Sequence, residues 1–228
     1  MDLLDWARGP LLAVALGVFA GGTAWRLARI LALPRQPDRS PPRSGAPTLA
    51  AGAFGAIVRG MWPRRDFGQV AAVTTFNGYV FHIGLALVFL GYAPHIAFVR
   101  RLTGVSWPAL PDVVMYVAAG ATILSLLLAL WLRITDPVRR LISSADDHIS
   151  WTVTFLPFVT GMAVMAEPSA QLLPHAESPL YRTPLALHLV SLELLLVWFP
   201  FGKLMHALLF AFSRGATGMR FSHRGVGV

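Results

Sequence analysis

Four of the seven histidines in this 228-residue chain lie within or at the ends of two apolar segments. His82 and His95 belong to one segment, and His188 and His206 belong to a second, later one. Ionisable side chains are costly inside a hydrocarbon core, so such residues are candidates for function by default. Neutral imidazole nitrogens bind metals, haem iron included. Two histidines on each of two helices therefore suggest metal or haem ligation.

The elements that would position these histidines are membrane-spanning helices. The chain is 55% hydrophobic and 13% charged, whereas a soluble domain carries about 25% charged residues. Five apolar runs are each long enough to cross a hydrocarbon core of about 30 Å. They cover roughly Pro10–Leu33, Val73–Val99, Asp112–Leu132, Ile149–Ala166 and Pro184–Phe212. The sequence predicts an all-α membrane protein in which five transmembrane helices form a single domain over residues 1–228.

The distribution of basic residues predicts the orientation of this bundle. Fifteen of the 19 Lys and Arg residues fall on one side of the predicted spans and four on the other. The positive-inside rule then places the N-terminus outside and the C-terminus in the cytoplasm of a bacterial inner membrane. Because topology accounts for the net charge of +8, nucleic acid is not expected as a partner.

The connection over about residues 34–72 is basic, and its Pro34–Pro47 part is rich in proline. It is predicted to be an extended cytoplasmic loop, either a solvated connector or a docking surface for a soluble subunit or anionic lipid. The chain has no cysteine. Disulfides, thiolate metal sites and thioether attachment of haem are therefore excluded.

Helical geometry arranges the four histidines into two pairs. His188 and His206 are 18 residues apart, which on one continuous helix is five turns and about 27 Å, close to the bilayer thickness. The two spans run in opposite directions, so His82 pairs with His206 near the cytoplasm, and His95 pairs with His188 near the outside. Two pairs at two depths suit two haems, each held by two axial histidines in a helical bundle.

The outer pair fits a regular helix less well. His95 follows His82 by 13 residues, which places it about 140° away around the helix. Pro94 can kink the preceding turn and bring His95 round. His175 and Met165 are alternative outer ligands.

With these residues the chain resembles the gamma subunit of respiratory nitrate reductase, a five-span dihaem cytochrome b. FHIG at Phe81–Gly84 looks like that family's first-ligand motif, and FPFGKLMH at Phe199–His206, together with His188, looks like its fifth-span ligand pair. Residues 136–162 are similar to its third loop and fourth span. The resemblance implies that His82 and His206 bind the haem near the cytoplasm and that His188 binds the distal haem.

The chain also departs from that family. The family usually separates its second-span histidines by ten residues, and here that position is Tyr92. The family places a quinone pocket beside the distal haem, with a basic residue for which Arg100 and Arg101 are the nearest candidates. The partners implied are the quinone pool, the lipid bilayer and soluble iron–sulfur or molybdenum-enzyme subunits on the cytoplasmic side.

Three other ionisable residues stand out. Glu193, five residues after His188, is either a structural carboxyl group or a proton relay. Lys203 either pairs with a haem propionate or extends to the cytoplasmic surface. Arg26, at the end of the first span, anchors the interface or reaches a propionate.

The predicted function is a membrane anchor that passes electrons between quinone and a soluble iron–sulfur subunit through two b-type haems. The alternative is a membrane transporter or assembly factor in which the histidines bind a metal or line a polar path. That class usually shows broken helices or repeat symmetry.

Overall fold

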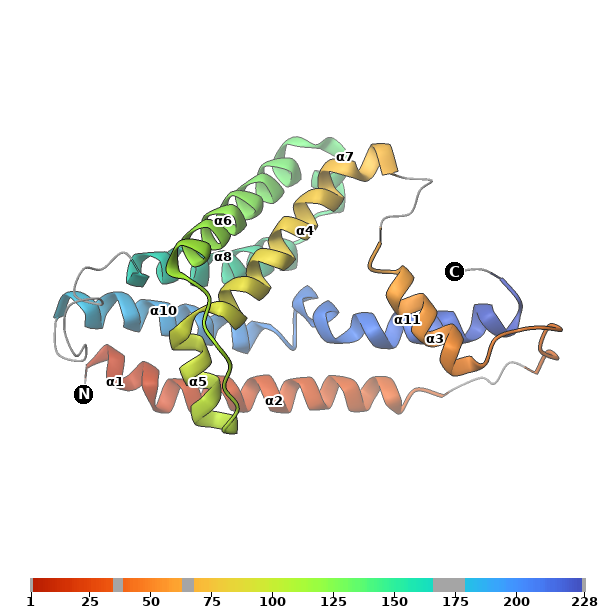
Figure 1. Ribbon diagram of the computed structural model, residues 1–228, viewed down its shortest axis with the longest axis horizontal. Helices are drawn as coiled ribbons and strands as arrows, with labels where there is room; N and C mark the ends of the chain where they lie inside the picture. Colours follow the sequence, from red (N-terminus) through yellow and green to blue (C-terminus); the bar gives the residue numbers. More distant parts are fainter. Residues whose placement is uncertain (1, 35–38, 63–67, 166–178, 227–228) are drawn as a thin grey trace.

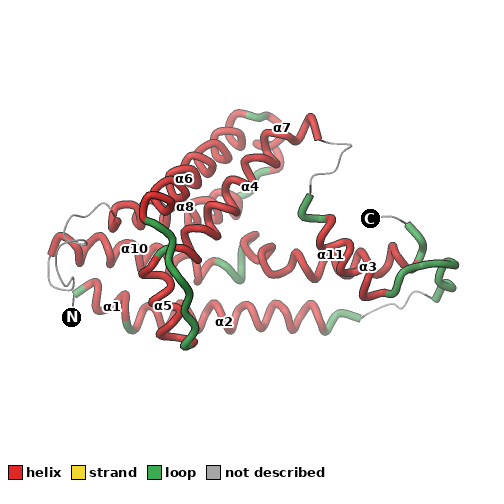
Figure 2. Tube along the Cα trace, in the orientation of Figure 1, coloured by secondary structure: helices red, strands yellow, loops and turns green. Residues whose placement is uncertain are grey.

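The computed structural model describes residues 2–34, 39–62, 68–165 and 179–226, and this part of the chain is helical throughout apart from its connections (Figures 1 and 2). In chain order the helices are α1 (Leu3–Arg8), α2 (Pro10–Leu31), α3 (Leu49–Arg59), α4 (Gly68–Gly91), α5 (Ala93–Thr103), α6 (Asp112–Thr135), α7 (Pro137–Ile142), α8 (Ala145–Met165), α10 (Pro179–Trp198), the short 3-10 helix η2 (Lys203–Met205) and α11 (His206–His223). Within these described ranges, four segments are each long and apolar enough to cross a membrane, and a bent pair of helices could form a fifth span. This confirms the prediction of an all-α protein with membrane-spanning character.

The helices pack through small and polar side chains. Between α4 and α6, the side chains of Asn77 and Ser125 donate to each other's carbonyl groups at 3.0 and 2.9 Å. Gly84 faces the hydroxyl of Thr122 so closely that a Cβ atom there would overlap it. Helices in lipid gain no hydrophobic driving force against each other, so close packing and interhelical hydrogen bonds hold them together.

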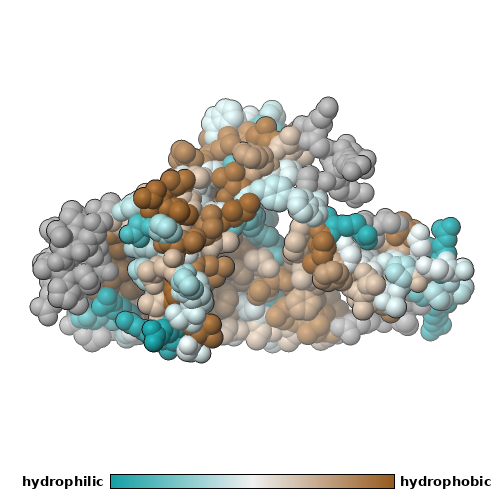
Figure 3. Space-filling view, in the orientation of Figure 1, coloured by the Kyte–Doolittle hydropathy of each residue, from teal (hydrophilic) through white to brown (hydrophobic). Residues whose placement is uncertain are grey.

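Large apolar side chains cover the outside of the bundle. Phe76, Val113, Val117 and Leu124 are each more than 60% exposed, and Figure 3 shows the apolar surface over α4 and α6. In a water-soluble monomer a patch of this extent would be unusual. Facing lipid, the same side chains lie in an apolar solvent.

The second predicted span ends earlier than the sequence indicated. Helix α4 stops at Gly91, the chain is extended at Tyr92, and Pro94 lies in the first turn of the separate helix α5. The carbonyl groups freed at this break have partners: Leu90 accepts from the Trp107 indole, and Gly91 accepts from a backbone N–H at 2.9 Å. A break at membrane depth needs such partners, because lipid supplies none.

The fifth predicted span is not one continuous helix, so the expectation of five unbroken turns between His188 and His206 was wrong. Helix α10 ends at Trp198, and the chain then bends by 79° before it resumes at Lys203. Pro200 cannot donate to a helical carbonyl, and Gly202 is extended with φ −96° and ψ −174°. The carbonyl of Pro200 accepts a hydrogen bond of 2.8 Å from Arg26 of α2.

The basic connection contains a helix that the sequence did not reveal. Helix α3 packs on α11, with Gly52 and Gly218 so close that a Cβ atom on either would overlap the other helix. The described loop before α3 is tied to the end of α11, where the His223 ring lies 2.8 Å from the carbonyl of Ser40. This part of the chain is therefore a packed helix pair as well as a connector.

Gly84→Ala should destabilise the protein, because its methyl group would overlap Thr122 and push α4 away from α6. Overpacking of this kind costs about 1–3 kcal/mol, which should lower the melting temperature in detergent. Gly120→Ala is the matched control, since a Cβ atom at Gly120 of α6 meets nothing within 4 Å. Equal melting temperatures for the two variants would contradict the close contact between α4 and α6.

Candidate functional site

His82 and His206 lie opposite each other, as the sequence predicted, although the helix between His188 and His206 is broken. His82 projects from α4, and His206 is the first residue of α11. Their ring centres are 6.3 Å apart, and the ring planes are nearly perpendicular at 87°. The two rings therefore lie close together although the helix is bent after α10.

His95 and His188 form the second pair. Their ring centres are 6.2 Å apart, and the planes are inclined by only 20°. His95 reaches this position because the chain breaks at Tyr92, so the 140° mismatch of a regular helix does not arise. Of the rival outer ligands, Met165 ends α8, where its carbonyl accepts from the hydroxyl of Tyr116. His175 lies outside the described residues.

The spacing of both pairs suits two nitrogens on opposite sides of one metal ion. With metal–nitrogen bonds of about 2 Å, and each nitrogen about 1 Å from its ring centre, the two ring centres lie roughly 6 Å apart. Both measured separations agree with this value. Within the described ranges, no three His, Asp or Glu side chains gather into a cage that could hold a metal ion. A porphyrin supplies the remaining four ligands itself, so two histidines on opposite faces suffice for haem iron.

Each of the four rings is also held through its Nδ1 atom. Carbonyl groups accept from three of the rings: that of Gly78 from His82 (2.7 Å), that of Lys203 from His206 (2.8 Å) and that of Val88 from His95 (3.0 Å). The partner of His188 is the hydroxyl of Thr160 at 3.2 Å, which can donate or accept. A neutral imidazole that donates from Nδ1 keeps its lone pair on Nε2. Metal-binding histidines characteristically make this second hydrogen bond.

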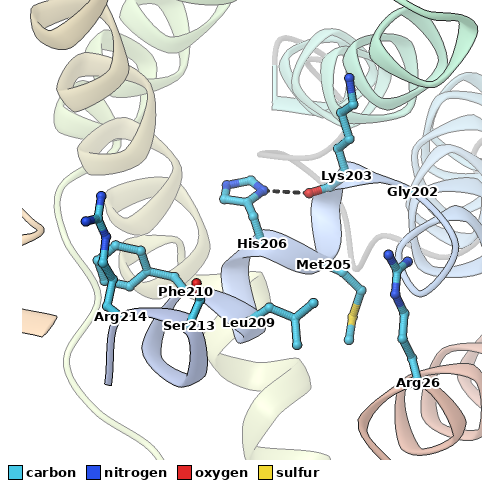
Figure 4. Close-up of a pocket in the computed structure, with 9 residues that line it drawn as sticks. All are labelled: Arg26, Gly202, Lys203, Met205, His206, Leu209, Phe210, Ser213 and Arg214. Atoms are coloured by element: carbon cyan, nitrogen blue, oxygen red, sulfur yellow. Dashed lines mark hydrogen bonds between the residues drawn. The ribbon is translucent and has the colours of Figure 1, made fainter. Parts of the chain in front are cut away.

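The His206 ring borders a pocket of about 620 Å³ (Figure 4). That volume lies within the roughly 300–1,000 Å³ of small-molecule and cofactor sites. Arg26 of α2 and Arg214 of α11 line it together with His206, so two guanidinium groups could bind an anionic edge such as a haem propionate. The ammonium group of Lys203 pairs with Asp147 at 2.6 Å, and the Lys203 side chain is 54% exposed.

Residues of α8 line the outer pair, and the sequence analysis gave them no role. A Cβ atom on Gly161 would lie 3.1 Å from the His188 ring, so a glycine there gives the ring room. Thr160 also lies 3.0 Å from the hydroxyl of Ser191 on α10. In the sequence, the adjacent Thr160 and Gly161 within an apolar span could have indicated a polar contact and a close approach at this position.

The glycines of the second span mostly serve helix packing. Gly84 packs on α6, and Gly91 packs against Leu110 and Met115. Gly78 alone has open space beside it, one turn from His82. Glu193 is buried in α10 at 6% exposure, and its Oε1 has no hydrogen-bond partner among the described residues.

No protein-family model matches the chain, and no solved structure matches it significantly. It is 32% identical over 225 residues to a protein of Nitratidesulfovibrio vulgaris (strain Hildenborough) whose name states no activity. The aligned region covers 94% of this chain and 91% of that protein. The chain therefore belongs to the same family as this Nitratidesulfovibrio vulgaris protein.

Proposed function

We propose that this protein is a membrane-embedded dihaem cytochrome b, the anchor and electron-transfer subunit of a redox complex. One observation carries the proposal: two pairs of histidines each have ring centres about 6 Å apart, and every Nδ1 has a hydrogen-bond partner. Packing alone does not require both features at four intramembrane or interfacial histidines.

In this proposal His82 and His206 hold one haem b, and His95 and His188 hold the other. Haem supplies one-electron redox chemistry when it is bound. The chain would fix the position of each haem through the rings, and the half-buried rings of the outer pair would limit the access of competing ligands. Arg26 and Arg214, which line the pocket beside His206, would supply positive charge for the anionic groups of the first haem.

The orientation of the chain in the membrane decides which histidine pair lies near each membrane face. We place α5 and the His95–His188 pair at the outer face and α3, α7 and α11 at the cytoplasmic face, in a bacterial inner membrane. Quinone would then exchange electrons at the outer pair, and a soluble iron–sulfur or molybdenum-enzyme subunit would do so at the basic cytoplasmic side.

Purified protein should contain two b-type haems per chain, measured by pyridine haemochrome and a reduced-minus-oxidised spectrum. His82→Ala and His206→Ala should each remove the same haem, because one ring cannot hold low-spin iron from both sides. His95→Ala and His188→Ala should remove the other. His223→Ala is the matched control, since His223 contacts the loop at Ser40.

Because each haem is assigned to one pair of histidines, double variants within one pair and across the two pairs should give different haem contents. The double variant His82→Ala/His206→Ala should retain one haem, whereas His82→Ala/His188→Ala should retain none. Well-folded protein that binds no haem would overturn the proposal, and stoichiometric binding of a divalent cation by that protein would instead favour the transporter or assembly-factor alternative.

Cysteine labelling can measure the orientation, because the native chain has no cysteine. In intact spheroplasts a membrane-impermeant maleimide should label Ser106→Cys, in the α5–α6 connection, and should leave Ser44→Cys unlabelled until the cells are lysed. Both side chains are exposed in the structure. The reverse pattern would invert the proposed orientation and move the quinone site to the other face.

A further inference from the structure

A buried carboxylate joins three parts of the chain near His206. Oδ2 of Asp147 in α8 lies 2.6 Å from Nζ of Lys203 in η2, and Oδ1 lies 3.1 Å from Nη1 of Arg133 in α6. Ser144 adds two hydrogen bonds to Oδ2, from its N–H at 2.9 Å and its hydroxyl at 3.0 Å. The Asp147 side chain is only 7% exposed. The Lys203 side chain is 54% exposed and that of Arg133 is 34% exposed, so the carboxylate is buried while its two cationic partners still reach solvent.

The neighbouring Asp146 also contacts the non-helical segment between α10 and η2. Its Oδ1 accepts from the backbone N–H of Lys203 at 3.3 Å and from the hydroxyl of Ser150 at 2.9 Å. Ser150 in turn accepts from the indole of Trp198, the last residue of α10, at 3.1 Å. Both ends of the bend between α10 and α11 are thus tied to the first turns of α8.

This network ends at the His206 ring. The carbonyl of Lys203 accepts from Nδ1 of His206 at 2.8 Å. Figure 4 shows this carbonyl directed at the ring, while the Lys203 side chain extends away from it. The position of Lys203 therefore sets both the direction of the ring and its tautomer.

We propose that Asp147 is the positioning residue for His206. Its ion pair with Lys203 fixes the position of the Lys203 carbonyl, and that carbonyl orients the His206 ring toward His82. The inference rests on the proposed haem site. It goes beyond that site, because Asp147 lies on a different helix from both ligands and touches neither. Outer-sphere partners of this kind typically change metal affinity by 10- to 100-fold.

The test uses the full-length protein with its haems. Asp147→Asn removes the charge and keeps the volume, and Lys203→Gln removes the other charge and keeps the backbone carbonyl. Asp136→Asn is the matched control, because Asp136 also pairs with an arginine at 3.3 Å on the same side, but it caps α7. The measurements are the rate of haem transfer to apomyoglobin, the midpoint potentials, and the electron paramagnetic resonance signal of the oxidised haems.

We expect Asp147→Asn and Lys203→Gln each to weaken retention of one haem by roughly 10- to 100-fold. That haem should be the one that His206→Ala removes, and its resonance signal should change because the nearly perpendicular ring planes are no longer fixed. The haem between His95 and His188 should keep its potential and signal. The double variant should be no worse than the more severe single one, because both act through one contact.

The outcomes separate this inference from the proposed function. If wild-type protein holds two haems and both single variants keep wild-type transfer rates and signals, Asp147 has no positioning role although the haem site stands. If both haems weaken equally in the variants, the network is a general fold element and the inference is wrong. If Asp147→Asn does not fold, Lys203→Gln gives the same decision. Wild-type protein without haem would overturn both proposals.

Discussion

A hydrogen bond from Nδ1 to an oxygen atom of the chain is the interaction on which the candidate site depends. Within lipid, a backbone carbonyl that is not used by a helix must find a donor inside the protein. Here the carbonyls of Val88 and Lys203 lie at or beside the two helix breaks and accept from His95 and His206. Each of these carbonyls also accepts a backbone N–H, from Tyr92 at the first break and from His206 at the second. The ring bond is therefore a second hydrogen bond on a carbonyl oxygen, which has two lone pairs. At each break the chain places an acceptor beside a histidine ring, and that contact orients the ring.

The two breaks also explain how four rings from different segments meet in pairs. An unbroken second span would direct His95 away from the face of His82, and the break at Tyr92 lets α5 carry it to His188 instead. An unbroken fifth span would hold His188 and His206 on one straight face. The bend of 79° places His206 at the start of a new helix, tied to α8 through Asp146 and Asp147.

Residue types and hydropathy were enough to predict the spans to within a few residues, except where a span ends in a break, and to select the four histidines. The prediction that Pro94 redirects His95 agrees with the structure, because proline removes a helical donor at a known place. The consequence of Pro200 and Gly202 was missed, since both residues also occur in continuous membrane helices. Thr160, Gly161 and Asp147 could not be assigned, because their roles arise from contacts between helices that are distant in sequence. Helix α3 was missed because its neighbours are rich in proline and arginine.

The separation of His82 and His95 by 13 residues has a consequence for recognising distant relatives. A search pattern that fixes the number of residues between two ligands assumes that one continuous helix carries both. Here the helix is interrupted at Tyr92. The number of residues between the two ligands can therefore change while the rings keep their positions, provided that the extra or missing residues lie in the non-helical break. Relatives with other spacings would escape such a pattern, and a comparison of ring positions in space would find them.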